Sequence, residues 1–211
     1  MYAKALFHAA MGFLLGGIPF AYLLTRWLAG VDILRRSEDG NPGTANAFVY
    51  GGPLVGLLSL LCDLGKGYLP VMLGMRLLPP ENKLVPLVML APVLGHAFSP
   101  VLLRMARNEG IILRRTGGKC IATGFGALLS LIPATYIALV PAVFYLLLLV
   151  LPVHPNERKT IWAFGLSAVA ALVVSMPDTV RIGCMAIFAL TIWRNWRDAH
   201  APAAGSGRTC G

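Results

Sequence analysis

The chain has 211 residues, of which 57% are hydrophobic and only 13% charged, and its formal net charge is +9. A soluble domain usually carries about 25% charged residues, so this composition excludes an ordinary soluble domain and predicts an integral membrane protein. The positive charge does not indicate nucleic-acid binding, because lysine and arginine accumulate in cytoplasmic loops of membrane proteins and no motif of basic and aromatic residues is present. The four cysteines lack C-x-x-C spacing and nearby histidines, which argues against a metal site.

Apolar segments of about bilayer length follow one another along the whole chain. The first has no Lys, Arg, Asp or Glu from Ala5 to Thr25 and no small-residue cleavage site after it, so we interpret it as a retained span. A single helix from Cys120 to Asn156 would be roughly 55 Å long, and Pro133 is expected to divide it. The seven expected spans are residues 5–28, 53–78, 84–103, two within 120–156, 160–176 and 179–194, with five or six spans as alternatives.

We therefore predict an all-α integral membrane fold, a polytopic bundle of about seven transmembrane helices with two Gly-rich cytoplasmic loops. It forms one domain over residues 1–198, and residues 199–211 are predicted to be a disordered C-terminal tail. An N-terminus outside and a C-terminus in the cytoplasm satisfy the positive-inside rule. Inside would then be Arg26, Arg35, Arg36, Arg104, Arg107, Arg114, Arg115, Lys119, Arg158, Lys159, Arg194, Arg197 and Arg208, and outside Lys4, Arg76, Lys83 and Arg181.

The first polar loop contains Asp39-Gly40-Asn41-Pro42-Gly43-Thr44-Ala45-Asn46. Two glycines and a proline in so short a stretch favour a tight, irregular backbone. Such a backbone can direct several N–H groups at one point and so bind an anion. An ordinary turn between two spans is the alternative interpretation.

The second polar loop ends Thr116-Gly117-Gly118-Lys119-Cys120-Ile121-Ala122-Thr123 and then enters a helix. A glycine pair, a lysine and a threonine at a helix start are typical of a phosphate-binding turn, because the backbone N–H groups and the helix dipole favour an anion. The first glycine of a Walker A loop is missing. A basic loop at the membrane surface is the alternative.

Two ionisable groups, Asp63 and Lys66, lie within a predicted span, three residues apart and so on one helical face. Ionisable residues inside a membrane are costly and are usually paired and functional. The sequence leaves open whether this pair only neutralises itself or lines a site. His96 is a third such group, for which a buried, hydrogen-bonded histidine is the alternative to a functional one.

Six short segments occur in a fixed order along the chain, and their combination is more specific than any one of them. They are Gly17-Ile18-Pro19-Phe20-Ala21-Tyr22-Leu23-Leu24-Thr25-Arg26, Gly30-Val31-Asp32-Ile33, Gly40-Asn41-Pro42-Gly43, Asp63-Leu64-Gly65-Lys66-Gly67, Gly95-His96-Ala97-Phe98, and Gly117-Gly118-Lys119 with Ala122-Thr123. This set resembles the bacterial PlsY family, the acyl-phosphate:glycerol-3-phosphate acyltransferases, over about residues 12 to 126, and the remainder resembles it by hydropathy.

The resemblance implies a seven-span enzyme of the bacterial inner membrane that transfers a fatty acyl group from acyl phosphate to the 1-hydroxyl of glycerol 3-phosphate, giving lysophosphatidic acid. It implies no metal and no other cofactor. Its partners would be the two substrates and membrane lipids, and no nucleic acid. Acyl phosphate is an activated donor, so such an enzyme mainly has to position two phosphates and a hydroxyl.

Candidate roles follow from the resemblance. Lys119, Asn41 and His96 are expected to be catalytic, with Lys119 on a phosphate and Asn41 orienting the hydroxyl or carbonyl. Asp63 and Lys66 are expected to support them. The residues expected to bind substrate are Gly40, Gly43, Asn46, Gly117, Gly118 and Thr123.

The chain also departs from the family pattern. Asp39 stands where the family has Ser, and a carboxylate there is expected to repel a phosphate unless the arginines of an insertion around residues 104–115 neutralise it or it turns away. The family's C-terminal His and Asn are not recognisable, and Arg194-Asn195-Trp196-Arg197 is the candidate remnant of them. Two alternatives to an enzyme therefore stand: a non-catalytic relative that binds lipid phosphate or a partner, and, with fewer polar residues to support it, a small transporter.

Overall fold

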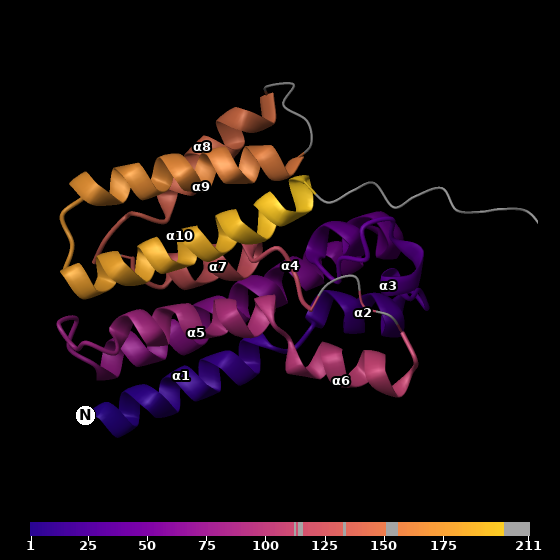
Figure 1. Ribbon diagram of the computed structural model, residues 1–211, viewed down its shortest axis with the longest axis horizontal. Helices are drawn as coiled ribbons and strands as arrows, with labels where there is room; N and C mark the ends of the chain where they lie inside the picture. Colours follow the sequence, from indigo (N-terminus) through magenta and orange to yellow (C-terminus); the bar gives the residue numbers. More distant parts are fainter. Residues whose placement is uncertain (112, 114–115, 133, 151–155, 201–211) are drawn as a thin grey trace, which may run out of the picture.

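The computed structural model describes residues 1–111, 113, 116–132, 134–150 and 156–200. Within these residues the regular structure is α-helical, as predicted. The helices are α1 (Tyr2–Gly16), α2 (Phe20–Leu28), α3 (Ile33–Arg36), α4 (Thr44–Leu77), α5 (Val85–Ala97), α6 (Pro100–Asn108), α7 (Ile121–Leu129), α8 (Leu139–Val150), α9 (Asn156–Val173) and α10 (Asp178–Ala199). The longer helices run along the long axis of the molecule, and α2, α3 and α6 gather at one end of it (Figure 1).

Three helical segments of the described chain are long and apolar enough to cross a membrane: Tyr2–Leu28, Thr44–Leu77 and Val85–Asn108. Helices α7 and α8 contain 9 and 12 residues. At 1.5 Å per residue these are about 14 and 18 Å long, less than the hydrocarbon core of about 30 Å. The fold class is therefore confirmed, whereas the count of seven spans stays a prediction.

Two spans that were predicted as continuous helices are interrupted. The first is divided between α1 and α2 at Gly17–Pro19, and the third between α5 and α6 at Phe98 and Ser99. The prediction was wrong at these places because a proline has no N–H for the helical ladder, and Pro19 and Pro100 stand where the second helix of each pair begins. The Ser99 hydroxyl also caps α6, since it accepts a hydrogen bond from the Leu102 N–H at 3.0 Å.

Helix α4 is kinked near its start. Gly52 has φ 85° and ψ 174°, a conformation that glycine adopts far more readily than other residues. Pro53 then occupies the first position of the long part of the helix, where its missing N–H costs nothing. The predicted start of the second span at residue 53 therefore agrees with the structure, and residues 44–51, before the kink at Gly52, form a separate helical arm.

Two hydrophobic cores hold the bundle together. The larger one contains Phe164 of α9 and Phe188 of α10, whose ring centroids lie 5.9 Å apart in an edge-to-face arrangement. The smaller one contains Tyr22, Ile33 and Leu102, from α2, α3 and α6. The smaller core fixes the segment between α2 and α4 at the end of the bundle, and so positions the first polar loop.

The C-terminal part of the bundle agrees with the predicted pattern of helices. Two helices, α7 and α8, occupy the long uncharged segment, and α9 and α10 follow it. The proposed break, Pro133, lies outside the described residues. Helix α10 continues to Ala199, and the rest of the predicted tail, residues 201–211, also lies outside them.

Candidate functional site

The two helix breaks lie side by side and are joined by side chains. The Ser99 hydroxyl donates a hydrogen bond to the Gly17 carbonyl, and the Lys66 ammonium of α4 donates to the Ile18 carbonyl at 2.8 Å. Carbonyls released by a broken helix need donors from the protein when no water is at hand. Ser99 and Lys66 supply them, and so fix the end of α1 relative to α4 and α5.

Lys66 is also paired with Asp63. Their Nζ and Oδ1 atoms lie 2.7 Å apart, and both side chains are almost fully buried. The Thr44 hydroxyl, in the first turn of α4, donates to Asp63 Oδ2 at 2.9 Å. The pair therefore neutralises itself, and it also ties the first polar loop to the helix breaks; Asp63 lines the pocket described below as well.

His96 lies in the last turn of α5, directly beneath the second polar loop. Its carbonyl accepts a hydrogen bond from the Gly118 N–H at 3.1 Å. A Cβ on Gly118 would overlap the His96 imidazole, and one on Gly117 would overlap the carbonyls of His96 and Ala97. Both glycines are thus required by close packing, whatever ligand the turn binds.

A small pocket lies where these segments converge. Its lining comes from both helix breaks, from the two polar loops and from α4, which are far apart in the sequence. The lining residues are Gly16, Ile18, Pro19, Pro42, Asp63, His96, Ser99, Leu102, Gly117 and Gly118. Five of the six segments that carry the family resemblance therefore meet at one place.

The first polar loop is organised by Asp39. Its Oδ1 accepts hydrogen bonds from the Asn41 N–H at 3.0 Å and from Asn46 Nδ2 at 2.8 Å. Asn46 Nδ2 also donates to the Asn41 carbonyl at 2.8 Å, so this amide group holds the loop. Gly40 has φ 59°, and Gly43 packs against the Asn41 side chain. The Asn41 side chain itself is buried, and its Oδ1 has no hydrogen-bond partner within the described part of the chain.

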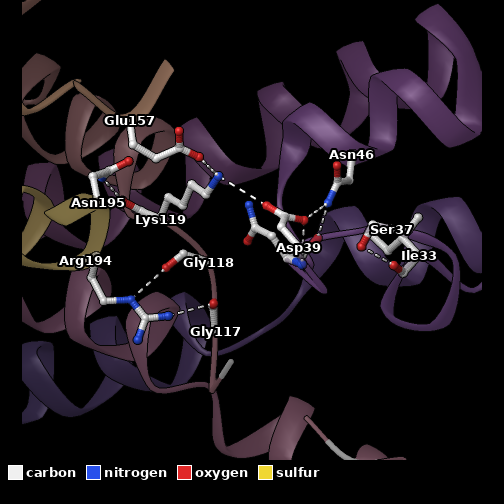
Figure 2. A network of polar contacts seen from close by, with 11 residues as sticks. Ile33, Ser37, Asp39, Asn46, Gly117, Gly118, Lys119, Glu157, Arg194 and Asn195 are labelled. Atoms are coloured by element: carbon white, nitrogen blue, oxygen red, sulfur yellow. Dashed lines mark hydrogen bonds and ion pairs between the residues drawn. The ribbon is translucent and has the colours of Figure 1, made fainter. Parts of the chain in front are cut away.

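Lys119 joins the two polar loops. Its Nζ lies 3.2 Å from Asp39 Oδ2 and 2.6 Å from Oε1 of Glu157, in the first turn of α9 (Figure 2). Burial raises the pKa of Asp39, but the hydrogen bond from Asn46 and the positive charge of Lys119 outweigh this effect, so the pKa lies below its usual value. Asp39 is therefore a carboxylate at neutral pH.

Asp39 is not turned away from the second polar loop, because it contacts Lys119, a partner that the sequence did not suggest. Neutralisation of Asp39 by the inserted arginines stays a prediction. Arg104 and Arg107 are exposed on α6, and Arg114 and Arg115 lie outside the described residues. Lys119, the residue expected to bind a phosphate, is one partner of Asp39, and no spacing rule in the sequence connects residues 39 and 119.

Helix α10 supports the second polar loop from behind. Arg194 Nη2 donates to the Gly117 carbonyl at 2.7 Å, and its Nε donates to the Gly118 carbonyl at 3.2 Å (Figure 2). Asn195 Nδ2 donates to the Lys119 carbonyl at 3.1 Å. The sequence offered Arg194-Asn195-Trp196-Arg197 only as a remnant of the family's C-terminal His and Asn, and neither Arg194 nor Asn195 was among the predicted site residues. Their signal was a polar pair, Arg194-Asn195, at the end of an apolar segment.

Thr123 and Glu157 complete the comparison with the predicted site. Thr123 is fully buried in α7, its backbone packs closely against Gly67 of α4, and its hydroxyl has no hydrogen-bond partner among the residues described. Glu157 was not a candidate, because a single acidic residue at a helix start has the simpler role of complementing the helix dipole. No group of three or more His, Cys, Asp or Glu side chains in the described ranges could hold a metal ion.

Residues 6–204 match the glycerol-3-phosphate acyltransferase family. A glycerol-3-phosphate acyltransferase of Myxococcus xanthus is 39% identical over 184 residues, which are 87% of this chain and 88% of the relative. One from Azotobacter vinelandii is 31% identical over 201 residues, covering 95% and 96%. Crystal structures of PlsY, an integral membrane glycerol 3-phosphate acyltransferase, are similar in fold: the glycerol 3-phosphate form has a TM-score of 0.76 and 28% identity, and the lysophosphatidic acid form 0.75 and 27%, each over 92% of this chain and 89% of that chain.

Proposed function

This chain belongs to the glycerol-3-phosphate acyltransferase family, and on that premise we propose that it transfers a fatty acyl group from acyl phosphate to the 1-hydroxyl of glycerol 3-phosphate. The chain is an integral membrane acyltransferase. The proposal adds the donor, the accepting hydroxyl and the residues that act on them. The observation that carries it is the convergence of five motif segments at one pocket beside Lys119.

The reaction needs positioning more than strong acid–base chemistry. The hydroxyl oxygen of glycerol 3-phosphate forms a bond to the acyl carbon, and the bond between that carbon and the phosphate oxygen of the donor breaks. The products are lysophosphatidic acid and inorganic phosphate, and the phosphate takes the hydroxyl proton. Well-oriented reactants gain effective molarities of about 10⁵ M or more, so a pocket that aligns two phosphates with the hydroxyl supplies much of the rate.

The residues in and beside the pocket suit these tasks. Lys119 and the Gly117–Gly118 turn, whose Gly118 N–H is held by the His96 carbonyl, would bind a phosphate. Asn41 offers a buried Oδ1 acceptor that can receive a hydrogen bond from the hydroxyl. The side chains that would support this arrangement are those of His96, Asp63 and Lys66. The first polar loop would be shaped by Gly40, Gly43 and Asn46. Thr123, whose buried hydroxyl also has no hydrogen-bond partner among the described residues, would add a polar group at the start of α7.

A direct assay tests the proposal. Purified protein is incubated with radiolabelled glycerol 3-phosphate and an acyl phosphate, and labelled lysophosphatidic acid is measured. Product formation that depends on both substrates is expected. No product in the presence of membrane lipids would favour the alternative, a non-catalytic relative. The contacts of Asp39 and Glu157 with the Lys119 ammonium are compatible with a loss of catalysis.

We also propose an orientation in the bacterial inner membrane, with the N-terminus outside and the C-terminus in the cytoplasm. The short helices α2, α3 and α6, the C-terminal ends of α5 and α10 and the N-terminal end of α9 lie at one end of the bundle (Figure 1). This end carries most of the basic residues that the positive-inside rule assigns to the cytoplasm. In intact cells, an impermeant thiol reagent is expected to label Asn82→Cys and to leave Glu38→Cys and Arg107→Cys unlabelled. Labelling of the latter two would reverse the orientation.

A further inference from the structure

The Lys119 ammonium is shared by two carboxylates from different elements. Asp39 comes from the first polar loop and Glu157 from the start of α9 (Figure 2). The two contacts are unequal: Glu157 Oε1 lies at 2.6 Å and its side chain is 18% exposed, whereas Asp39 Oδ2 lies at 3.2 Å and its side chain is 32% exposed. The contact to Asp39 is therefore the longer and the more accessible of the two.

A phosphate cannot join this arrangement without a change. A carboxylate at the position that a phosphate would take on the Lys119 ammonium repels a phosphate dianion. An ammonium has three donors, so it can keep one carboxylate and exchange the other for a phosphate oxygen. The weaker and more solvent-accessible contact exchanges more easily, because less desolvated ion pairs contribute less free energy.

We propose that Asp39 is a specificity-determining residue that occupies the phosphate position on Lys119, and that a substrate phosphate binds by displacing it while Glu157 keeps Lys119 in place. This inference rests on the proposed function. It assigns Asp39 a role in substrate affinity: competition raises the KM for a phosphate-bearing substrate and leaves the chemical step unchanged.

The two oxygens of Asp39 have separate tasks, which makes a clean test possible. Oδ1 organises the loop by accepting from Asn41 and Asn46, and Oδ2 contacts Lys119. Asp39→Asn keeps an oxygen for the loop and replaces Oδ2 by an NH₂ group, which cannot accept a hydrogen bond from an ammonium. This variant therefore removes the competitor and retains the loop.

Asp32 provides the matched control in the same polar segment. Its Oδ1 accepts from the N–H groups of Leu34 and Arg35, and its Oδ2 lies 3.6 Å from Arg35 Nε. Asp32→Asn makes the same chemical change at a carboxylate whose cationic partner is an exposed arginine. It is expected to leave both KM values unchanged.

The experiment measures kcat and KM of the purified enzyme with glycerol 3-phosphate and acyl phosphate varied in turn. Asp39→Asn is expected to lower the KM of one substrate roughly twofold to tenfold, the range for a partly exposed ion pair, with kcat within about a factor of two. The substrate whose KM falls identifies the phosphate that Lys119 binds. Asp39→Ser is expected to behave in the same way, and Asp39→Glu, which restores the charge, to return KM toward the wild-type value.

Each other outcome has a defined meaning. Unchanged KM values for both substrates, or a raised KM with lower kcat, would overturn the inference and leave the proposed activity standing. If the wild-type enzyme forms no product, the proposed function fails, and the inference is then tested by calorimetric titration with inorganic phosphate. Tighter phosphate binding by Asp39→Asn than by wild type supports displacement, and equal or weaker binding contradicts it.

Discussion

Lys66 and Lys119 both contact an aspartate, but in contrasting surroundings. The Lys66–Asp63 pair is 2.7 Å long, almost fully buried, and tied by further hydrogen bonds to Thr44 and to the Ile18 carbonyl. Lys119 lies at the edge of the bundle, where its partners Asp39 and Glu157 remain partly exposed. Removing one member of a buried pair leaves a charge without solvent, whereas a partly exposed charge can find water or another anion. Burial therefore makes the first pair structural and leaves the second able to exchange partners.

The largest expected effect comes from breaking the buried pair. Asp63→Leu leaves the Lys66 ammonium uncompensated, and such changes cost about 3–5 kcal/mol of unfolding free energy. The measurement is unfolding in mixed micelles. The double variant Asp63→Leu/Lys66→Met is expected to recover part of the loss but not all of it, because the Ile18 carbonyl loses its donor. If the single variant were as stable as wild type, water would have to reach this pair. The Lys66 and Lys119 pairs would then not differ in their role.

Removing the exchangeable lysine is expected to affect activity instead of folding. Lys119→Ala deletes a charge-assisted hydrogen bond to a phosphate, worth about 1.5–3 kcal/mol, which corresponds to roughly 10- to 100-fold lower kcat/KM. The amount of protein in the membrane should equal that of Lys83→Ala, a control at an exposed lysine. Full activity of Lys119→Ala would refute its role in binding phosphate.

Ser99 is an uncharged side chain that, like Lys66, donates a hydrogen bond to a backbone carbonyl at a helix break. Its hydroxyl satisfies the Gly17 carbonyl and caps α6, so Ser99→Ala is expected to cost about 1–2 kcal/mol of stability, less than the loss of a buried charge partner. Unfolding in mixed micelles measures it, with Ser175→Ala in the exposed turn after α9 as control. If Ser99→Ala cost as much stability as Asp63→Leu, the hydrogen bond to the Gly17 carbonyl would contribute as much to the helix breaks as the buried ion pair does.

Acid should produce the smallest effect at the partly exposed pair. The pKa of Asp39 in the folded protein is below the usual value of about 3.9. Its contribution to stability is therefore complete above the unfolded pKa and is lost as the pH falls through the folded pKa. Between pH 6 and pH 3, the melting temperature of wild type should fall slightly more than that of Asp39→Asn. Parallel curves would show that the Asp39 carboxylate contributes nothing to folding.

The sequence predicted the membrane class and the segments that form the site, but not how the helices end. Composition and apolar length are properties of short stretches, and they gave the helical pattern around Pro53 and between α7 and α10 correctly. The breaks at Pro19 and Pro100 were missed because a proline within an apolar run can either kink a helix or end it. The outcome depends on whether another element supplies donors, as Ser99 and Lys66 do here.

The site shows the same division. The sequence was enough to select several site residues, because their residue types and order match a known pattern. These are Lys119, Asn41, His96 and the glycine pair. Glu157 and Arg194 could not, because each contacts the second polar loop from a helix that lies far away in the sequence. A lone carboxylate and a terminal arginine are common at helix ends, so their residue types alone do not indicate a site.

The amino-acid sequence by itself determined that this chain is a helical membrane protein of one acyltransferase family, because hydrophobicity, proline and glycine act through the local chain. Only the tertiary structure decided which charges meet. Ion pairs form between charged groups that lie close together in the folded protein. Lys119 therefore contacts Asp39 and Glu157 only when α4, α7 and α9 are packed together. Whether a charged residue is structural or exchangeable is decided at that level, because the dielectric surroundings exist only in the folded protein.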